Sequence, residues 1–155
     1  MRRTFVVSSR IPAPREAVYK FHEDPSVLPE ICPDEAPVKL LSKRNTLEKG
    51  AVDVLKVRIL PLVWVKWIAR HFAVSPGYYF ADRQEKGPFK FWQHVHRFIT
   101  TGPNETLLVD EVEYELPFGR LGDWIAGGFV ARQLARVFQH RHHATAAALA
   151  LRRHA

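Results

Sequence analysis

The sequence predicts an α+β domain in which a curved antiparallel sheet surrounds one long C-terminal helix. Short segments of alternating apolar and charged residues recur along the chain, separated by Gly, Pro or Asn turns, which is typical of strands joined as hairpins. From residue 121 onward apolar residues instead recur every three or four positions, as on one face of a helix. With 155 residues, of which 46% are hydrophobic, the chain can bury one core, and we expect a single domain over residues 1–155.

The predicted order is one strand, two short helices, six strands and the long helix. The first strand covers residues 3–11. Pro14 opens a short helix, and residues 24–26 cap a second one that ends before Pro33. Hairpin-length turns between the later strands predict an antiparallel meander. The six later strands are expected at residues 38–43, 51–59, 64–74, 78–85, 89–100 and 105–116.

The long helix is expected over residues 121–151, with one apolar stripe facing the sheet. Gly127 and Gly128 lie inside it, each costing about 1 kcal/mol relative to alanine. Two interpretations are open: close packing of the helix on the sheet, or a gap over the stripe in which a ligand lies. The stripe consists of Leu121, Trp124, Ile125, Gly128, Ala131, Leu134, Ala135 and Phe138.

Charge and composition bear on the class of partner. The net charge is +7, and the segment from Arg120 onward holds six arginines against Asp123 alone, a net of +5. A basic helix can face nucleic acid or anionic lipid, but aromatic residues are not interleaved with these arginines as a base-stacking surface requires. We therefore expect no nucleic acid partner, and a solvated outer face for the helix.

The sequence also bears on compartment and cofactors. The longest apolar run, residues 59–65, is interrupted by Pro61, so no membrane insertion is expected. The only cysteine, Cys32, excludes an internal disulfide, and the N-terminus becomes polar at Ser8, too soon for a secretory signal. We expect a cytoplasmic protein with no cofactor.

The least generic stretch is GPFKFWQHVHRF at residues 87–98, with FADRQ at 80–84 before it and DEVEYELPFG at 110–119 after it. Together with the element order, these segments resemble the START-like (SRPBCC) superfamily, in particular bacterial members described as polyketide cyclase/dehydrase or ligand-binding proteins. The resemblance implies a helix-grip fold, a seven-stranded sheet around the C-terminal helix with a cavity between them. It also implies a lipid, quinone or polyketide-like ligand. Only some relatives are enzymes, and no universal catalytic motif can be carried over.

Strand alternation predicts which side chains face the helix. Three glutamates at positions 111, 113 and 115 mark the outer face of their strand, so the residues between them point inward. A mostly apolar wall with a few polar groups is typical of a small-molecule pocket. The predicted ligand-binding residues are Phe80, Asp82, Gln84, Trp92, His94, His96, Phe98, Asp110, Val112 and Tyr114, with Trp124 and Gly128 from the helix.

His94 and His96 admit several interpretations. A buried histidine beside a carboxylate often belongs to a structural hydrogen-bond network. The same side chains can orient a polar group of a ligand, or act with Asp110 in general acid–base catalysis, for which His94, His96 and Asp110 are the candidates. A metal site with Asp82 or Asp110 as third ligand is the weakest interpretation, and we expect no metal.

The first functional hypothesis is a protein that binds a small hydrophobic molecule in the cavity. The alternative is a polyketide cyclase or dehydratase-type enzyme that uses a His/Asp pair. Two finer expectations concern other residues: the run at residues 140–143 (His-Arg-His-His) forms a solvated face, and at most one of Trp64 and Trp67 lines the cavity.

Overall fold

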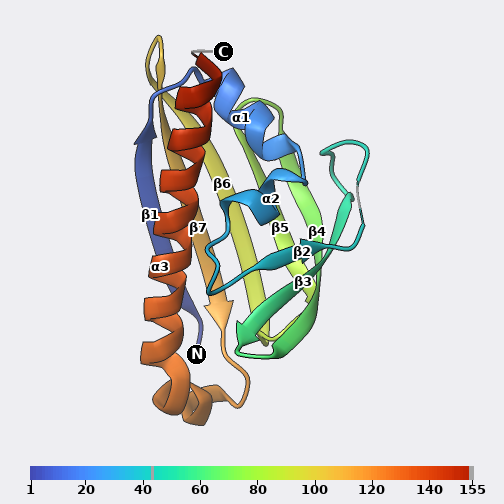
Figure 1. Ribbon diagram of the computed structural model, residues 1–155. Coiled ribbons are helices and arrows are strands. Elements are labelled where there is room, and N and C mark those ends of the chain that lie inside the picture. The colour runs from blue at the N-terminus through green and yellow to red at the C-terminus, as the bar shows by residue number, and fades with distance from the viewer. Residues whose placement is uncertain (43, 154–155) are drawn as a thin grey trace.

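A computed structural model describes residues 1–42 and 44–153 and has the predicted fold class. One antiparallel sheet of seven strands, in the order β1-β7-β6-β5-β4-β3-β2, curls around the long helix α3, with α1 and α2 closing one end (Figure 1). The strands are β1 (Arg3–Ile11), β2 (Val38–Leu40), β3 (Val52–Leu60), β4 (Val63–Ser75), β5 (Tyr79–Lys86), β6 (Phe91–Gly102) and β7 (Glu105–Glu115), and the helices are α1 (Arg15–Glu23), α2 (Val27–Ile31) and α3 (Gly119–Arg153).

Most predicted boundaries hold within two residues, and the clearest difference is β2. It ends at Leu40 rather than at residue 43, because the next two backbone N–H groups, of Leu41 and Ser42, both donate to the carbonyl of Val54 and so leave the regular ladder. The rest of that prediction falls on Lys43, which lies outside the described residues. Pro14 precedes α1 as its N-cap, with an extended backbone, instead of forming the first helical turn.

The predicted alternation of β6 and β7 is confirmed by burial. Along β7 every second side chain from Thr106 to Tyr114 is buried, whereas Glu111 and its outward neighbours are not. On β6, Trp92, His94 and Phe98 are buried on the same face. Period-two patterning therefore identified the inner wall of the sheet.

The apolar stripe of α3 is only partly as predicted. Asp123, not Trp124, faces the sheet: its carboxylate Oδ1 lies 3.3 Å from Nε of Arg3, and its Oδ2 lies 3.4 Å from the Met1 amino group. Since a helix turns about 100° per residue, Trp124 points away from the sheet and is 84% exposed. Gly128 is exposed for the same reason, while Gly127 is buried against the Arg3 side chain.

Two apolar cores flank a polar layer. The upper core, beneath α1, contains Val18, Phe98 and Leu149, and the lower core contains Trp92 and Phe138. The polar layer between them contains His94, Asp110 and His142, all buried. No helix among the described residues is long and apolar enough to cross a membrane.

Candidate functional site

A cavity of about 680 Å³ lies between the curled sheet and α3. Its lower part, near the turn that joins β7 to α3, is bordered by exposed apolar side chains that include Leu60, Phe118 and Leu121. Its upper part, beneath α1 and α2, carries the polar groups, among them His22 and His71. The site is therefore apolar towards one end and polar towards the other.

Five of the predicted ligand-binding residues line this cavity, and they come from β5 and β6. Trp92 packs edge-on against Trp67, with ring centroids 5.1 Å apart, and forms part of the apolar wall. Of the two tryptophans on β4, only Trp67 lines the cavity, as the alternation predicts. The five residues are Phe80, Asp82, Trp92, His94 and His96.

The other predicted residues lie elsewhere. The Gln84 amide donates to the Phe89 carbonyl at 2.7 Å and accepts from its N–H, so this side chain fixes the β5–β6 turn. Trp124 and Gly128 are turned away by the Asp123 ion pairs described above. The remaining four belong to the packed interior behind the cavity wall: Phe98, Asp110, Val112 and Tyr114.

Asp110 is the centre of a buried hydrogen-bond network. Its Oδ1 accepts from His94 Nε2 at 2.8 Å, and its Oδ2 accepts from His142 Nε2 at 2.6 Å. His96 Nδ1 forms an ion pair with Oδ1 at 2.9 Å. His142 Nδ1 lies 2.7 Å from the Ser9 hydroxyl. Imidazoles from β6 and α3 thus meet at one carboxylate of β7, and Ser9 of β1 joins the network through His142. The carboxylate orients His94 and His96, which line the cavity.

The environment separates the pKa values of the two cavity imidazoles. Burial opposes the charged form of His96, but the carboxylates of Asp110 and Asp82 outweigh it and raise its pKa from 6.5 to about 9. Burial and the neighbouring charge of His96 lower the pKa of His94. The rings are 3.7 Å apart between centroids, so a neutral imidazole stands beside an imidazolium at neutral pH.

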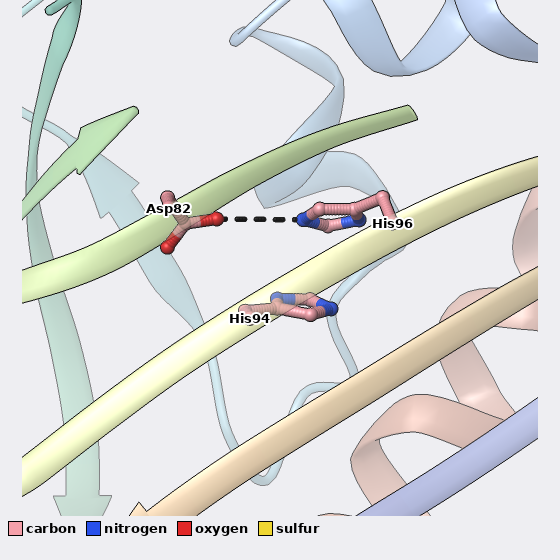
Figure 2. Close-up of side chains that lie close together, drawn as sticks. All are labelled: Asp82, His94 and His96. Atoms are coloured by element: carbon pink, nitrogen blue, oxygen red, sulfur yellow. Dashed lines mark ion pairs between the residues drawn. The ribbon is translucent and has the colours of Figure 1, made fainter. Parts of the chain in front are cut away.

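Asp82 forms an ion pair with the second ring nitrogen of His96, Nε2. Its Oδ2 lies 3.5 Å from His96 Nε2, as Figure 2 shows, with the ring of His94 on the same side of the sheet. Burial raises the pKa of Asp82, but the hydrogen bond and charge of the neighbouring imidazoles outweigh burial, so its net pKa is lowered. The His96 imidazolium therefore stands between two ionised carboxylates.

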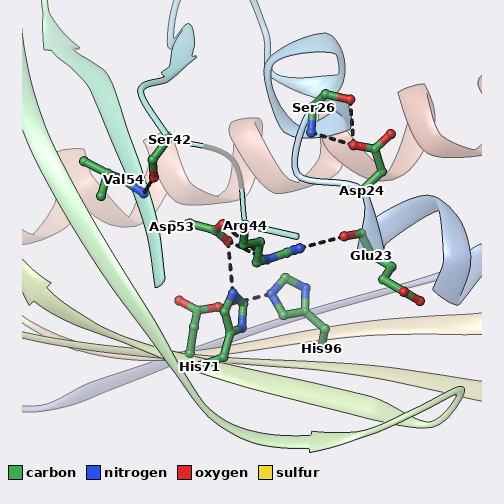
Figure 3. Close-up of polar contacts among 10 residues, drawn as sticks. Glu23, Asp24, Ser26, Ser42, Arg44, Asp53, Val54, His71 and His96 are labelled. Carbon is green, nitrogen blue, oxygen red and sulfur yellow. Dashed lines mark hydrogen bonds and ion pairs between the residues drawn. The ribbon is translucent and has the colours of Figure 1, made fainter. Parts of the chain in front are cut away.

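A second polar group lies beside the first, on β3, β4 and the loop before β3, where His71 is the ladder partner of Asp82. Asp53 Oδ2 accepts from Arg44 Nε at 3.2 Å and lies 3.0 Å from His71 Nε2 (Figure 3). Arg44 also donates to the Glu23 carbonyl at 2.7 Å, which ties the loop before β3 to the end of α1. Here a carboxylate contacts both a guanidinium and an imidazole.

Sequence analysis did not assign to the site several polar residues that the structure brings to the cavity or to Asp110, among them His22, His71, Arg141 and His142. The prediction of a solvated face at residues 140–143 is wrong for the middle pair, because His142 is buried and Arg141 lines the cavity. The signal was present, since His142 follows Phe138 by four positions and so shares its face of the helix. His71 likewise alternates with Trp67 and Ala69 along β4.

Asp82, His94 and His96 are also residue types that bind metal ions. One ligand atom from each lies within 4.8 Å of the others. However, a protonated imidazole has no lone pair to offer, and the His96 imidazolium supplies positive charge between the two carboxylates. We therefore assign no metal to this group, and a metal-free site stays a prediction.

The comparisons with known proteins agree with this architecture. The model of the family described as "Polyketide cyclase / dehydrase and lipid transport" matches residues 11–142. Among proteins of curated function, none matches the sequence.

Several solved structures share the fold. A START superfamily protein from Mycobacterium smegmatis superposes with a TM-score of 0.69 at 14% identity, covering 94% of that chain and 93% of this one. The Zhui aromatase/cyclase from Streptomyces sp. R1128 superposes with a TM-score of 0.65 at 18% identity, covering 91% of that chain and 96% of this one. Norcoclaurine synthase from Thalictrum flavum superposes with a TM-score of 0.70 at 10% identity, covering 87% of that chain and 96% of this one. At these identities the likeness shows the fold alone.

Proposed function

Because the chain belongs to the family of polyketide cyclases/dehydrases and lipid transport proteins, we propose that it binds a small amphiphilic molecule between its sheet and α3. Lipids, quinones and polyketide-like compounds are the classes that suit such a site. The observation that carries the proposal is the cavity itself, apolar over most of its wall and polar at its upper end. Burial of the apolar part of the ligand drives binding, while the polar end fixes its direction.

The position of the polar groups supports binding in one orientation. His94 and His96 line the cavity beside Asp82. Asp110 contacts both imidazoles from the packed interior, and Asp82 pairs with His96. Pre-oriented polar groups cost little ordering on binding, which favours affinity and selectivity. An oxygen atom on the ligand would meet these side chains at the upper end, with its apolar part directed towards the lower rim.

The test is to block the cavity without unfolding the protein. Val130 lines the cavity from α3, whereas Arg132 is exposed on the opposite face of the same helix. We expect Nile red, a neutral apolar dye, to bind wild type with a rise in fluorescence. Val130→Trp should weaken binding roughly tenfold or more by filling the space, and the matched control Arg132→Trp should change it less than about twofold. Equal binding by all three proteins would contradict the proposal.

A second candidate is an enzyme, and one observation favours it. His94 and His96 stand side by side in the cavity with their pKa values shifted in opposite directions, which is the pattern of a base next to an acid. In a 3-hydroxyacyl substrate, neutral His94 would take the C2 proton while His96 donates its proton to the departing hydroxyl. The products are the enoyl compound and water, and Asp110 keeps both rings in place.

This candidate is tested with 3-hydroxydecanoyl N-acetylcysteamine thioester, following the absorbance of the enoyl product. If the pair acts as acid and base, His94→Gln and His96→Gln should each lower the rate about 100-fold, whereas His143→Gln, at an exposed position of α3, should not. Absence of turnover by wild type, with Nile red binding intact, would reject the enzyme and leave the carrier.

A further inference from the structure

Among the described residues, three arginines line the cavity, and only Arg141 forms neither an ion pair nor a hydrogen bond. Among the described residues, Arg44 is paired with Asp53, and Arg58 donates to the Asp34 carbonyl at 2.6 Å. Arg141 also lines the cavity, yet within the described part of the chain its guanidinium forms no ion pair or hydrogen bond. Its Nε is buried without an acceptor.

The position of Arg141 places it in the upper, polar half of the cavity. Its guanidinium carbon lies 4.9 Å from the ring centroid of Phe138, one turn earlier on α3. The same Phe138 ring packs edge-on against His94, with centroids 5.1 Å apart. Arg141 is thus one aromatic ring away from the imidazoles that reach the cavity, and the preceding turn of the same face presents Leu134 and Val137.

A guanidinium in this setting selects for a particular ligand group. Arg141 is half-buried, and burial of its Nε without an acceptor among the described residues is unfavourable. Arg presents a planar set of N–H donors that matches the two oxygens of a carboxylate. The phenyl ring of Phe138 stabilises the positive charge but offers no hydrogen-bond acceptor in the guanidinium plane. The missing acceptor is therefore expected from a molecule bound in the cavity.

We propose that the ligand of this cavity carries a single carboxylate, bound by Arg141, with its apolar part running along α3 towards the lower rim. This deepens the proposed function and rests on it. A phosphate monoester fits less well, because it carries between one and two negative charges. The other cations on the wall already have partners: Arg44 pairs with Asp53, and His96 pairs with Asp82 and Asp110. Asp82 would also repel a second negative charge.

The experiment compares an acid with its neutral ester. The probes are 11-(dansylamino)undecanoic acid and its methyl ester, titrated by fluorescence at neutral pH into wild type and two variants. Arg141→Gln removes the proposed contact. Arg136→Gln removes the same charge from an exposed position of the same helix and controls for net charge.

We expect wild type and Arg136→Gln to bind the acid about tenfold more tightly than the ester, and Arg141→Gln to bind the two about equally. Equal binding of acid and ester by wild type, or a preference that survives in Arg141→Gln, would overturn the carboxylate assignment while leaving the proposed function standing. Tighter binding of oleoyl lysophosphatidate than of oleate by wild type would overturn it in favour of phosphate. Failure of both dansyl probes and of Nile red to bind would overturn the proposed function together with this inference.

Discussion

At the scale of single residues, Asp110 holds the polar part of the candidate site together through contacts with three imidazoles. Its carboxylate is 4% exposed and meets three imidazoles from two different elements. Burial raises the pKa of Asp110, but the charge of His96 and the hydrogen bonds from the three rings outweigh it, so the net pKa lies well below 3.8. Asp110 therefore stays ionised and compensates the one imidazolium that faces the cavity.

We expect Asp110→Asn to lower the free energy of unfolding by roughly 3 kcal/mol, because the His96 imidazolium loses its main buried counter-ion. Urea unfolding at neutral pH measures this. Glu111→Gln is the matched control on the opposite face of β7, since Glu111 pairs with Arg97 in an exposed ion pair worth about 0 to 1 kcal/mol. Equal effects of the two substitutions would contradict the assigned role of Asp110.

At the scale of elements, the rotation of α3 brings Asp123 and Gly127 to β1 and leaves Trp124 and Gly128 exposed. Gly127 faces β1, where a Cβ would come within 2.8 Å of Nη2 of Arg3, the side chain that pairs with Asp123. Gly128, one residue further, is exposed, and a Cβ there would meet only Nη1 of Arg132, at 3.7 Å. The first glycine thus permits close approach of helix and sheet, and the second has no packing role that the structure shows.

The two glycines predict opposite outcomes for the same substitution. Gly128→Ala should stabilise the protein by about 0.5–1 kcal/mol, because alanine favours the helix and its methyl group meets no neighbour closer than 3.7 Å. Gly127→Ala should gain less or lose stability, since the Arg3 guanidinium must move away from Asp123. Thermal unfolding of both variants checks this, and a larger gain at position 127 than at 128 would contradict the packing described.

At the scale of the whole molecule, two histidines should make stability depend on pH in opposite directions. The pKa of His96 is raised to about 9, so the folded state retains a proton that the unfolded chain loses above its ordinary 6.5. Its contribution is fully present below pH 6.5 and is lost as pH rises towards 9. Burial lowers the pKa of His22 to about 4, so stability is lost as pH falls from 6.5 towards 4.

We therefore expect the free energy of unfolding to be largest near pH 6.5 and to fall on both sides, by on the order of 3 kcal/mol for each histidine. Urea unfolding across this range gives the profile. His96→Gln should flatten the alkaline side. His22→Gln should reduce the loss on the acid side, where the lowered pKa values of His94 and Asp110 still contribute. Each variant should retain the other side of the profile. A profile that is flat between pH 6.5 and 9 in wild type would show that His96 does not hold its proton.

The fold could be predicted from the sequence because it depends on local patterns of apolar and polar residues. Alternation along residues 89–100 and 105–116 separated the buried face from the solvated one, since a strand exposes every second side chain to the same environment. The change to a three- and four-residue period after residue 121 identified the helix. The same patterns placed Trp92, His94 and His96 on the inner wall without any knowledge of their partners.

The composition of the site depended on contacts that no local pattern describes. His142 lies 32 residues from Asp110 and 133 from Ser9 in the sequence, and only the packing of α3 against β1 and β7 brings the three together. The packing of α3 buries Phe138 and His142 and pairs Asp123 with Arg3, and with this rotation Trp124 points outward, against the prediction. Burial periodicity is a local property of the sequence. Which charged groups meet, and which of the described arginines lines the cavity without a hydrogen-bond acceptor, follows only from how the helix and the sheet pack together.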